Sequence, residues 1–216
     1  MNKIFFISGL GANELAFSKI GELGLQKVMV KWIKNHKKES LNSYCLRLIE
    51  AYKISKDDCI SGLSFGGIVA QEIAHILGNR SVILISSFRD KSDLRFPFKL
   101  ALNIGLHKIF PLVKIPILEE IIANILNSGS KESKKVLKEM IRSTDYGLMR
   151  WSIQKIAEKR YEEKTDVTLF NLIGTKDRIV GLWSNETSYS IDGGSHFMVY
   201  DKSWEITKIL KGVIKK

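Results

Sequence analysis

One serine in the sequence stands in a pattern that could make its hydroxyl a nucleophile. Residues 62–66 read GLSFG, a G-x-S-x-G pattern, between an apolar run at Asp58–Ser61 and an amphipathic stretch that begins near Phe65. A serine on a tight turn from strand to helix is held in a strained conformation that lifts its hydroxyl clear of its neighbours, and flanking glycines remove side chains that would clash. The N-terminal amides of the helix would face the negative charge that develops on an attacked carbonyl. Ser64 is therefore the candidate nucleophile.

A serine nucleophile needs a base, and the chain has four histidines. His36 lies among lysines, and His75 lies three helical turns beyond Ser64, about 16 Å along a helix axis. His107 belongs to a segment that we expect to cover surface. His196 follows a glycine pair in a loop just before the last predicted helix, where a flexible backbone can aim an imidazole. The sequence therefore favours His196 as the base.

Three aspartates could orient the imidazole of His196. Asp166 precedes its predicted strand and so lies at the wrong end of a parallel sheet, whose active groups gather at the carboxyl ends of the strands. Asp177 follows that strand within a polar turn, TKDR, although any solvated loop can look like this. Asp192, four residues before His196, remains a rival. Asp177 is the preferred acid.

The elements that must position these residues alternate along the chain. Apolar runs bounded by turn residues predict buried strands at Lys3–Ile7, Lys27–Trp32, Asp58–Ser61, Ser81–Ser86 and Val167–Ile173. Amphipathic stretches predict helices at Glu14–Leu23, Leu41–Tyr52, Phe65–Leu77 and Ser203–Ile214. This alternation predicts the α/β class, with a mostly parallel sheet covered by helices on both faces. Met1–Ala12 superficially resembles a signal peptide, but its apolar core of four residues is better interpreted as the first strand.

Residues 88–165 are too many for one crossover between parallel strands, since a complete βαβ unit takes ~30 residues. All three prolines lie in the first half of this stretch, and longer amphipathic helices are predicted at Lys131–Ile141 and Leu148–Ala157. Apolar segments at Leu100–Leu106 and Ile115–Leu126 suggest helices that cover an apolar site. We expect a helical cap at 88–165, inserted into a core formed by residues 1–87 and 166–216.

These motifs, in this order, resemble those of the α/β-hydrolase superfamily, and the resemblance covers essentially the whole chain. That family orders its triad as serine, acid and histidine, which implies Ser64, Asp177 and His196. The turn at 174–180, GTKDRIV, is similar to the acid turn of the family, and residues 192–197, DGGSHF, are similar to its histidine loop. The family also places its cap where the insertion at 88–165 stands.

The loop after the first strand also bears on this resemblance. Residues 8–11, SGLG, are similar to the oxyanion loop of the family, in which His-Gly-x-Gly is commonest. Ser8 replaces that histidine here. The resemblance implies that the backbone N–H groups of Leu10 and Phe65 hold the oxyanion, because these donors do not depend on the side chain at position 8.

Composition excludes several other classes of function. The net charge is +11, but 26 of the 34 cations are lysines scattered among carboxylates, which argues against a nucleic-acid partner. No uncharged stretch approaches the ~18 apolar residues of a membrane span. No cluster has metal-ligand spacing and no glycine loop fits a nucleotide, so we expect no metal and no cofactor. Cys45 and Cys59 show no disulfide pattern, which favours a cytoplasmic location.

The interpretation from sequence is a serine hydrolase that cleaves an ester or thioester of a small to medium apolar acyl group through an acyl-enzyme. The same apparatus could serve an acyltransferase or a carbon–carbon bond hydrolase or lyase. A non-enzymatic ligand receptor is a further alternative. A lipase at a membrane surface is another, suggested by aromatic residues among cations at 96–114. Substrate identity and oligomeric state stay open.

Overall fold

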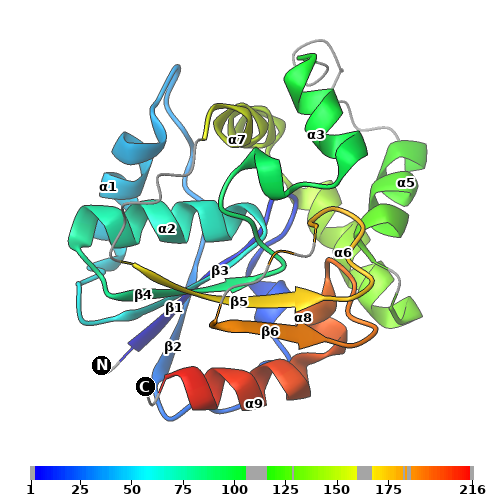
Figure 1. Ribbon diagram of the computed structural model, residues 1–216. Coiled ribbons are helices and arrows are strands. Elements are labelled where there is room, and N and C mark those ends of the chain that lie inside the picture. Colours follow the sequence, from blue (N-terminus) through cyan, green and yellow to red (C-terminus); the bar gives the residue numbers. More distant parts are fainter. Residues whose placement is uncertain are drawn as a thin grey trace.

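The computed structural model describes residues 3–105, 116–127, 129–159, 167–181, 183 and 186–214. His107 and Asp166 lie outside these residues, as do parts of the expected segments at 100–106 and 115–126. A sheet of six strands forms the centre of the molecule, with the order β2-β1-β3-β4-β5-β6 (Figure 1). All five strand pairings are parallel. The strands are β1 (Lys3–Ile7), β2 (Gln26–Val30), β3 (Cys59–Leu63), β4 (Ser81–Ile85), β5 (Thr168–Gly174) and β6 (Ser188–Ile191).

The chain order reverses between β1 and β3, because the chain first leaves β1 for the edge strand β2 and then returns to the other side of β1. Two neighbouring strands whose following loops diverge leave a crevice at their carboxyl ends, and this is where open α/β sheets bind their ligands. The GLSFG turn after β3 and the SGLG loop after β1 both start at this point.

Helices cover both faces of the sheet, as the sequence predicted. Alternate residues of the strands face opposite ways, so that Phe5 and Ile7 pack beneath one layer and Ile4 and Phe6 beneath the other. One layer contains α1 (Leu41–Tyr52) and α2 (Phe65–Leu77). The other contains the short 3₁₀ helix η1 (Glu14–Phe17), α8 (Met198–Asp201) and α9 (Ser203–Val213) (Figure 1).

Between β4 and β5 the described residues form four α-helices, which we call the β4–β5 helices: α3 (Phe96–Asn103), α5 (Pro116–Leu126), α6 (Lys131–Ser143) and α7 (Tyr146–Glu158), preceded by the 3₁₀ helix η2 (Lys91–Asp93). Ser130 and Asp145 cap the N-termini of α6 and α7 by accepting bonds from the amides of Ser133 and Leu148. The indole of Trp151 on α7 packs on Tyr44 of α1 and donates to the Glu39 carbonyl oxygen at 2.9 Å. These contacts fix α7 to the layer that contains α1 and α2.

Two predicted elements differ in the structure. The helix predicted at Glu14–Leu23 is only the 3₁₀ turn η1, although Ala16, Phe17, Ile20 and Leu23 are buried. Their helical spacing reflects packing of an irregular segment, whose Gly21 amide donates to Thr207 Oγ1 of α9. The edge strand β6 was not predicted, because its sequence SYSI is polar and only its last residue is fully buried. The other predicted strands and helices in the described residues are present, with ends that differ by no more than two residues, except that the helix expected at Leu100–Leu106 is α3, which begins four residues earlier.

Candidate active site

Ser64 lies at the junction of β3 and α2 with φ 52° and ψ −121°, a conformation that residues with side chains rarely adopt. Its backbone is held from two sides, because its amide donates to the Ile85 carbonyl oxygen at 3.0 Å and Ser87 Oγ donates to its carbonyl oxygen at 2.7 Å. A Cβ on Gly66 would overlap the carbonyl oxygens of Ile7 and Ser8. The glycine therefore lets the start of α2 approach β1 closely enough to form the turn.

The three residues that the sequence proposed as a triad come together at the carboxyl ends of the strands. Ser64 Oγ lies 2.9 Å from His196 Nε2. On the other side of the imidazole, Nδ1 lies 2.9 Å from Asp177 Oδ2 and 3.1 Å from Oδ1. With Nδ1 protonated and donating to the carboxylate, Nε2 is the free acceptor for the serine hydroxyl proton.

Asp177 is held by its own turn in a position that suits an ionised carboxylate. Its Oδ1 accepts the amides of Ile179 and Val180 at 2.8 and 2.9 Å, and its side chain is almost fully buried. Burial by itself would raise the pKa of this carboxyl. The charge and hydrogen bond of His196, together with the two amides, outweigh burial and lower the pKa below its ordinary value.

The rival acid, Asp192, is exposed and does not lie against the imidazole. Its Oδ1 accepts a bond from Thr175 Oγ1 at 3.2 Å. Among the described aspartates, Asp177 alone makes a hydrogen bond with His196.

The backbone N–H groups of Leu10, which lines the same cavity as Ser64, and of Phe65, which follows Ser64, have no acceptor within the described part of the chain. The Phe65 side chain is fully buried against Trp32, so only the backbone of this residue can face a ligand. Ser8 Oγ donates to the Ala12 carbonyl oxygen at 3.0 Å and the Ala12 amide donates to the Gly9 carbonyl oxygen at 3.1 Å. These two bonds close the loop around Leu10 with Ser8 in place of the histidine of the His-Gly-x-Gly pattern named above.

A cavity of about 310 Å³ opens onto Ser64 and His196. Its walls are almost wholly apolar, and every one of the β4–β5 helices contributes to them, through Phe98, Leu102, Ile122, Leu126, Leu137, Ile141, Met149, Ile153 and Ile156. Its volume is at the lower end of the ~300–1,000 Å³ that small-molecule pockets span.

A second hollow, of about 390 Å³, lies against the same loop at Leu10–Ala12. Its lining is more polar and includes Lys31 and Glu14, which form an ion pair at 3.5 Å. Neither Ser64 nor His196 lines it, so a molecule held there would not meet the serine hydroxyl.

Three contributors to this geometry were not predicted from the sequence. Ser87 holds the Ser64 carbonyl, Arg95 Nε donates to the Asp177 carbonyl oxygen at 2.7 Å, and Asn127 lies beside Ser195 next to His196. Each acts on a loop more than 20 positions away in the sequence, without a motif of its own. For Ser87 alone there is a hint in the sequence, because the two serines at 86–87 directly follow a predicted strand and polar residues at strand ends can reach the site.

Within the described residues, no group of three or more His, Cys, Asp or Glu side chains is arranged to hold a metal ion. Both cysteines are free and buried, and burial raises the pKa of Cys59 to about 12. The thiol of Cys59 is therefore protonated and a poor nucleophile. No helix in the described ranges combines the length and the apolar character that a bilayer crossing requires.

Known proteins share this architecture but not the sequence. No protein-family model and no curated protein matches the sequence. Solved structures do match. One is a thermophilic esterase from Thermogutta terrifontis, with a TM-score of 0.77 and 14% identity, over 100% of this chain and 90% of its own. A carboxylesterase structure from the thaumarchaeon Nitrososphaera gargenis has a TM-score of 0.76 and 17% identity, over 99% of this chain and 90% of its own.

A third structure, of the N-acyl homoserine lactonase AidH in complex with N-hexanoyl homoserine lactone, has a TM-score of 0.74 and 15% identity, over 100% of this chain and 90% of its own. The sequence identities are low, so these similarities concern the fold. The chain has the α/β-hydrolase fold along its whole length.

Proposed function

We propose that this protein is a serine hydrolase that cleaves an ester or thioester of a small to medium apolar acyl group. The observation that supports this best is the continuous line of hydrogen bonds from Asp177 through His196 to Ser64 Oγ, which ends at an apolar cavity. A Ser–His–Asp line whose half-buried hydroxyl faces a cavity can perform nucleophilic acyl transfer.

In this mechanism, Ser64 Oγ attacks the acyl carbonyl carbon while its proton passes to His196 Nε2. The negative oxygen of the tetrahedral intermediate accepts bonds from the Leu10 and Phe65 amides, which have no other acceptor in the described residues. The imidazolium is stabilised by the Asp177 carboxylate and gives its proton to the departing alcohol or thiol, leaving an acyl-serine. Water, deprotonated by His196, then attacks the acyl carbon, and the carboxylic acid leaves as Ser64 regains its proton.

The β4–β5 helices act as a cap in this proposal. They supply most of the apolar wall beside Ser64 and no charged side chain to it, so the acyl chain is the part of the substrate that fits there. The esterase neighbours and the lactonase with a six-carbon acyl group are compatible with this size class. Thioester hydrolysis, acyl transfer and carbon–carbon cleavage use the same apparatus and are alternatives. Because both cysteines are free and buried, we still expect a cytoplasmic location.

The deciding experiment is a screen of p-nitrophenyl and thioester substrates with acyl chains of two to twelve carbons. We expect hydrolysis by the wild-type protein, and a loss to background in Ser64→Ala with an unchanged circular dichroism spectrum. A fluorophosphonate should label one serine, which peptide mass spectrometry should identify as Ser64. Ser92→Ala, on the 3₁₀ helix η2, is the matched control and should keep full activity.

Two outcomes would contradict the proposal. Labelling of a different serine, or full hydrolysis by folded Ser64→Ala, would remove Ser64 from the mechanism. Binding of acyl compounds without any turnover would instead favour the receptor alternative.

A further inference from the structure

The two residues that flank His196 are both bonded to the turn between α5 and α6. The Phe197 amide donates to the Leu126 carbonyl oxygen at 3.0 Å, and Ser195 Oγ lies 3.4 Å from Asn127 Oδ1. Ser195 and Asn127 are both buried. The histidine loop is therefore held on both sides of His196, by the last residue of α5 and by the turn that follows it.

Asn127 also holds the α5–α6 turn together. Its Oδ1 accepts the Gly129 amide at 2.7 Å, and its Nδ2 donates to the fully buried Ser133 Oγ at 2.7 Å. A buried amide with both of its ends satisfied is a rigid element, because any displacement leaves a polar group without a partner. Asn127 thus links the start of α6 to the loop of His196.

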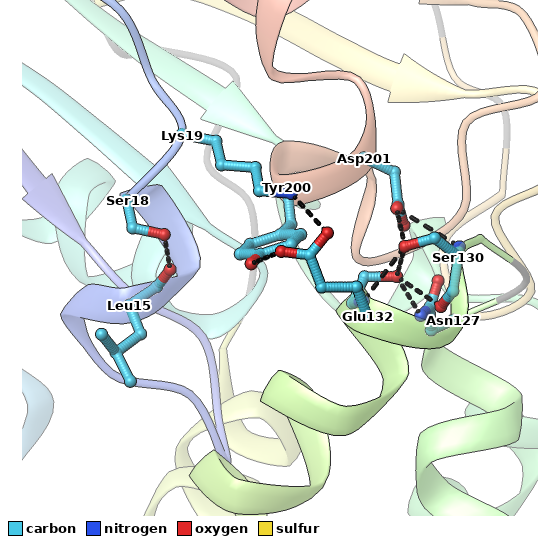
Figure 2. A network of polar contacts seen from close by, with 9 residues as sticks. Leu15, Ser18, Lys19, Asn127, Ser130, Glu132, Tyr200 and Asp201 are labelled. Carbon is cyan, nitrogen blue, oxygen red and sulfur yellow. Dashed lines mark hydrogen bonds and ion pairs between the residues drawn. The ribbon is translucent and has the colours of Figure 1, made fainter.

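The start of α6 also contacts the chain beyond His196, through two side-chain hydrogen bonds that Figure 2 shows together. Ser130 Oγ donates to Asp201 Oδ1 at 2.7 Å, and the Tyr200 hydroxyl donates to Glu132 Oε1 at 2.8 Å. Lys19 completes this group, because its ammonium pairs with Glu132 Oε2 at 2.9 Å and lies 4.2 Å from the centre of the Tyr200 ring. The Lys19–Glu132 ion pair is solvent-exposed and contributes little. Asn127, Ser133, Ser195 and Tyr200 are buried.

We propose that Asn127 is a positioning residue, which sets the place of His196 relative to Ser64 from outside the sheet. This inference rests on the proposed function, since it concerns the base of that reaction. The loop before His196 is already held on one side, because the Lys176 amide donates to the Gly194 carbonyl oxygen and the Gly193 amide donates to Thr175 Oγ1, both at 2.8 Å. Asn127 holds the other side of the histidine, at Ser195. A displacement of about 1 Å in a catalytic group can cost ~10²-fold in rate.

The test is Asn127→Ala beside Asn124→Ala, the matched control on α5, whose exposed side chain donates a hydrogen bond to Glu120. We expect kcat to fall about tenfold in Asn127→Ala, between no effect and the ~10²-fold cost of a 1 Å displacement, with KM changed less than twofold. The loss should be equal for acetate, butyrate and hexanoate esters. Labelling of Ser64 by a small fluorophosphonate should slow by the same factor, since it needs the Ser64–His196 pair but not the acyl cavity.

Two further variants separate positioning from folding. Asn127→Asp keeps the oxygen that meets Gly129 and Ser195, and should retain kcat within about threefold of the wild type. Ser195→Ala should lower kcat less than Asn127→Ala, and combining the two should cost less than the product of the single losses, as expected for residues in one network. If Asn127→Ala does not fold, Ser195→Ala decides the test, and a wild-type kcat and labelling rate in that variant would overturn the proposal.

The proposal is overturned if Asn127→Ala matches Asn124→Ala in kcat and labelling rate. It is also overturned if the loss grows with acyl chain length while labelling is unchanged, because Asn127 would then only support the cavity wall. If the wild-type protein reacts with the fluorophosphonate but hydrolyses none of the esters, the proposed function fails while the labelling rates still decide the role of Asn127.

Discussion

The loops at the ends of β1 and β3 are held mainly by backbone packed against backbone, whereas the β4–β5 helices above them are held by side chains. At the turn of Ser64, a single added methyl on Gly62 or Gly66 would overlap main-chain atoms. On α3, by contrast, no side chain is fully buried and Phe96 is 72% exposed. Backbone packing tolerates almost no change, while a side-chain wall can be rebuilt with other apolar residues. We therefore expect the sheet loops to determine the chemistry and the β4–β5 helices, apart from the turn of Asn127, to determine the acyl group.

The largest effect should come from the acid. Asp177→Asn removes the carboxylate that receives the Nδ1 proton and favours the wrong tautomer of His196, a change that costs ~10⁴ in turnover in the serine-protease precedent. The loss should be similar for every acyl length, because the defect lies in proton transfer. Steady-state kinetics on acetate and hexanoate esters would check both points.

Asp192→Asn is the control for this prediction, since Asp192 is exposed and bonded to Thr175. It should keep nearly all of the activity. A crippled Asp192→Asn, or a loss in Asp177→Asn that depends on the acyl chain, would contradict both the assignment of the acid and the division of roles between the two regions.

A smaller and selective effect should follow from changing the wall. Ile153 of α7 lines the cavity, and Ile153→Phe should shorten the space for the acyl chain. A difference of one methylene in an apolar pocket is worth ~1–3 kcal/mol, so the ratio of kcat/KM for hexanoate over acetate should fall at least about tenfold. The acetate ester alone should react within about threefold of the wild-type rate.

Ile121→Phe is the matched change for this comparison, because Ile121 of α5 is 47% exposed and is not part of the cavity wall. Its chain-length profile should coincide with that of the wild type. Equal losses for all esters in Ile153→Phe would mean that α7 acts on the chemistry, contrary to the division proposed above.

A still smaller effect is expected at Ser8, whose hydroxyl bonds the Ala12 carbonyl and shapes the loop of Leu10. In Ser8→Ala the buried carbonyl loses a donor, which typically costs ~1–3 kcal/mol of stability. Because the Leu10 amide remains present, kcat should fall less than the ~10²-fold seen when an oxyanion donor is removed. Thermal unfolding and ester kinetics on one sample would separate the two effects. An activity loss above that limit would show that the Ser8 hydroxyl has a more direct part in the chemistry.

The same contrast explains what could be predicted from the sequence. The Ser64 turn is local, because a strand, a glycine-flanked serine and a helix follow one another directly, and the predicted bounds of α1 and α2 agree with the structure. The order Ser64, Asp177, His196 could be proposed because Ser64 and Asp177 follow predicted strands, while His196 follows a glycine pair just before the last predicted helix, in the order of the family that these motifs resemble. Asn127 could not, since its partner Ser195 lies 68 positions away and an asparagine at a helix end usually only terminates the helix. The helix predicted at 14–23 was wrong, because the buried apolar residues of an irregular segment happen to have helical spacing.

The smallest effect concerns α3, which has apolar residues on two faces. Phe98 and Leu102 line the cavity, while Phe96, Leu100 and Ile104 are exposed at helical spacing, by 72%, 43% and 67%. Such a stripe beside lysines is what a lipase at a membrane surface would present. The cavity, however, is already formed and walled by these helices, so activity should not wait for an interface.

We expect kcat/KM for soluble butyrate esters to change less than twofold when anionic vesicles are added at moderate salt, where attraction to the surface is screened. Rates should also rise smoothly through the micelle concentration of longer esters. Phe96→Ser, which removes the most exposed ring of the stripe, should leave both results unchanged. A sharp rise at the micelle concentration, abolished by Phe96→Ser, would instead give α3 a role at lipid surfaces. The β4–β5 helices would then determine where the enzyme acts as well as which acyl group it accepts.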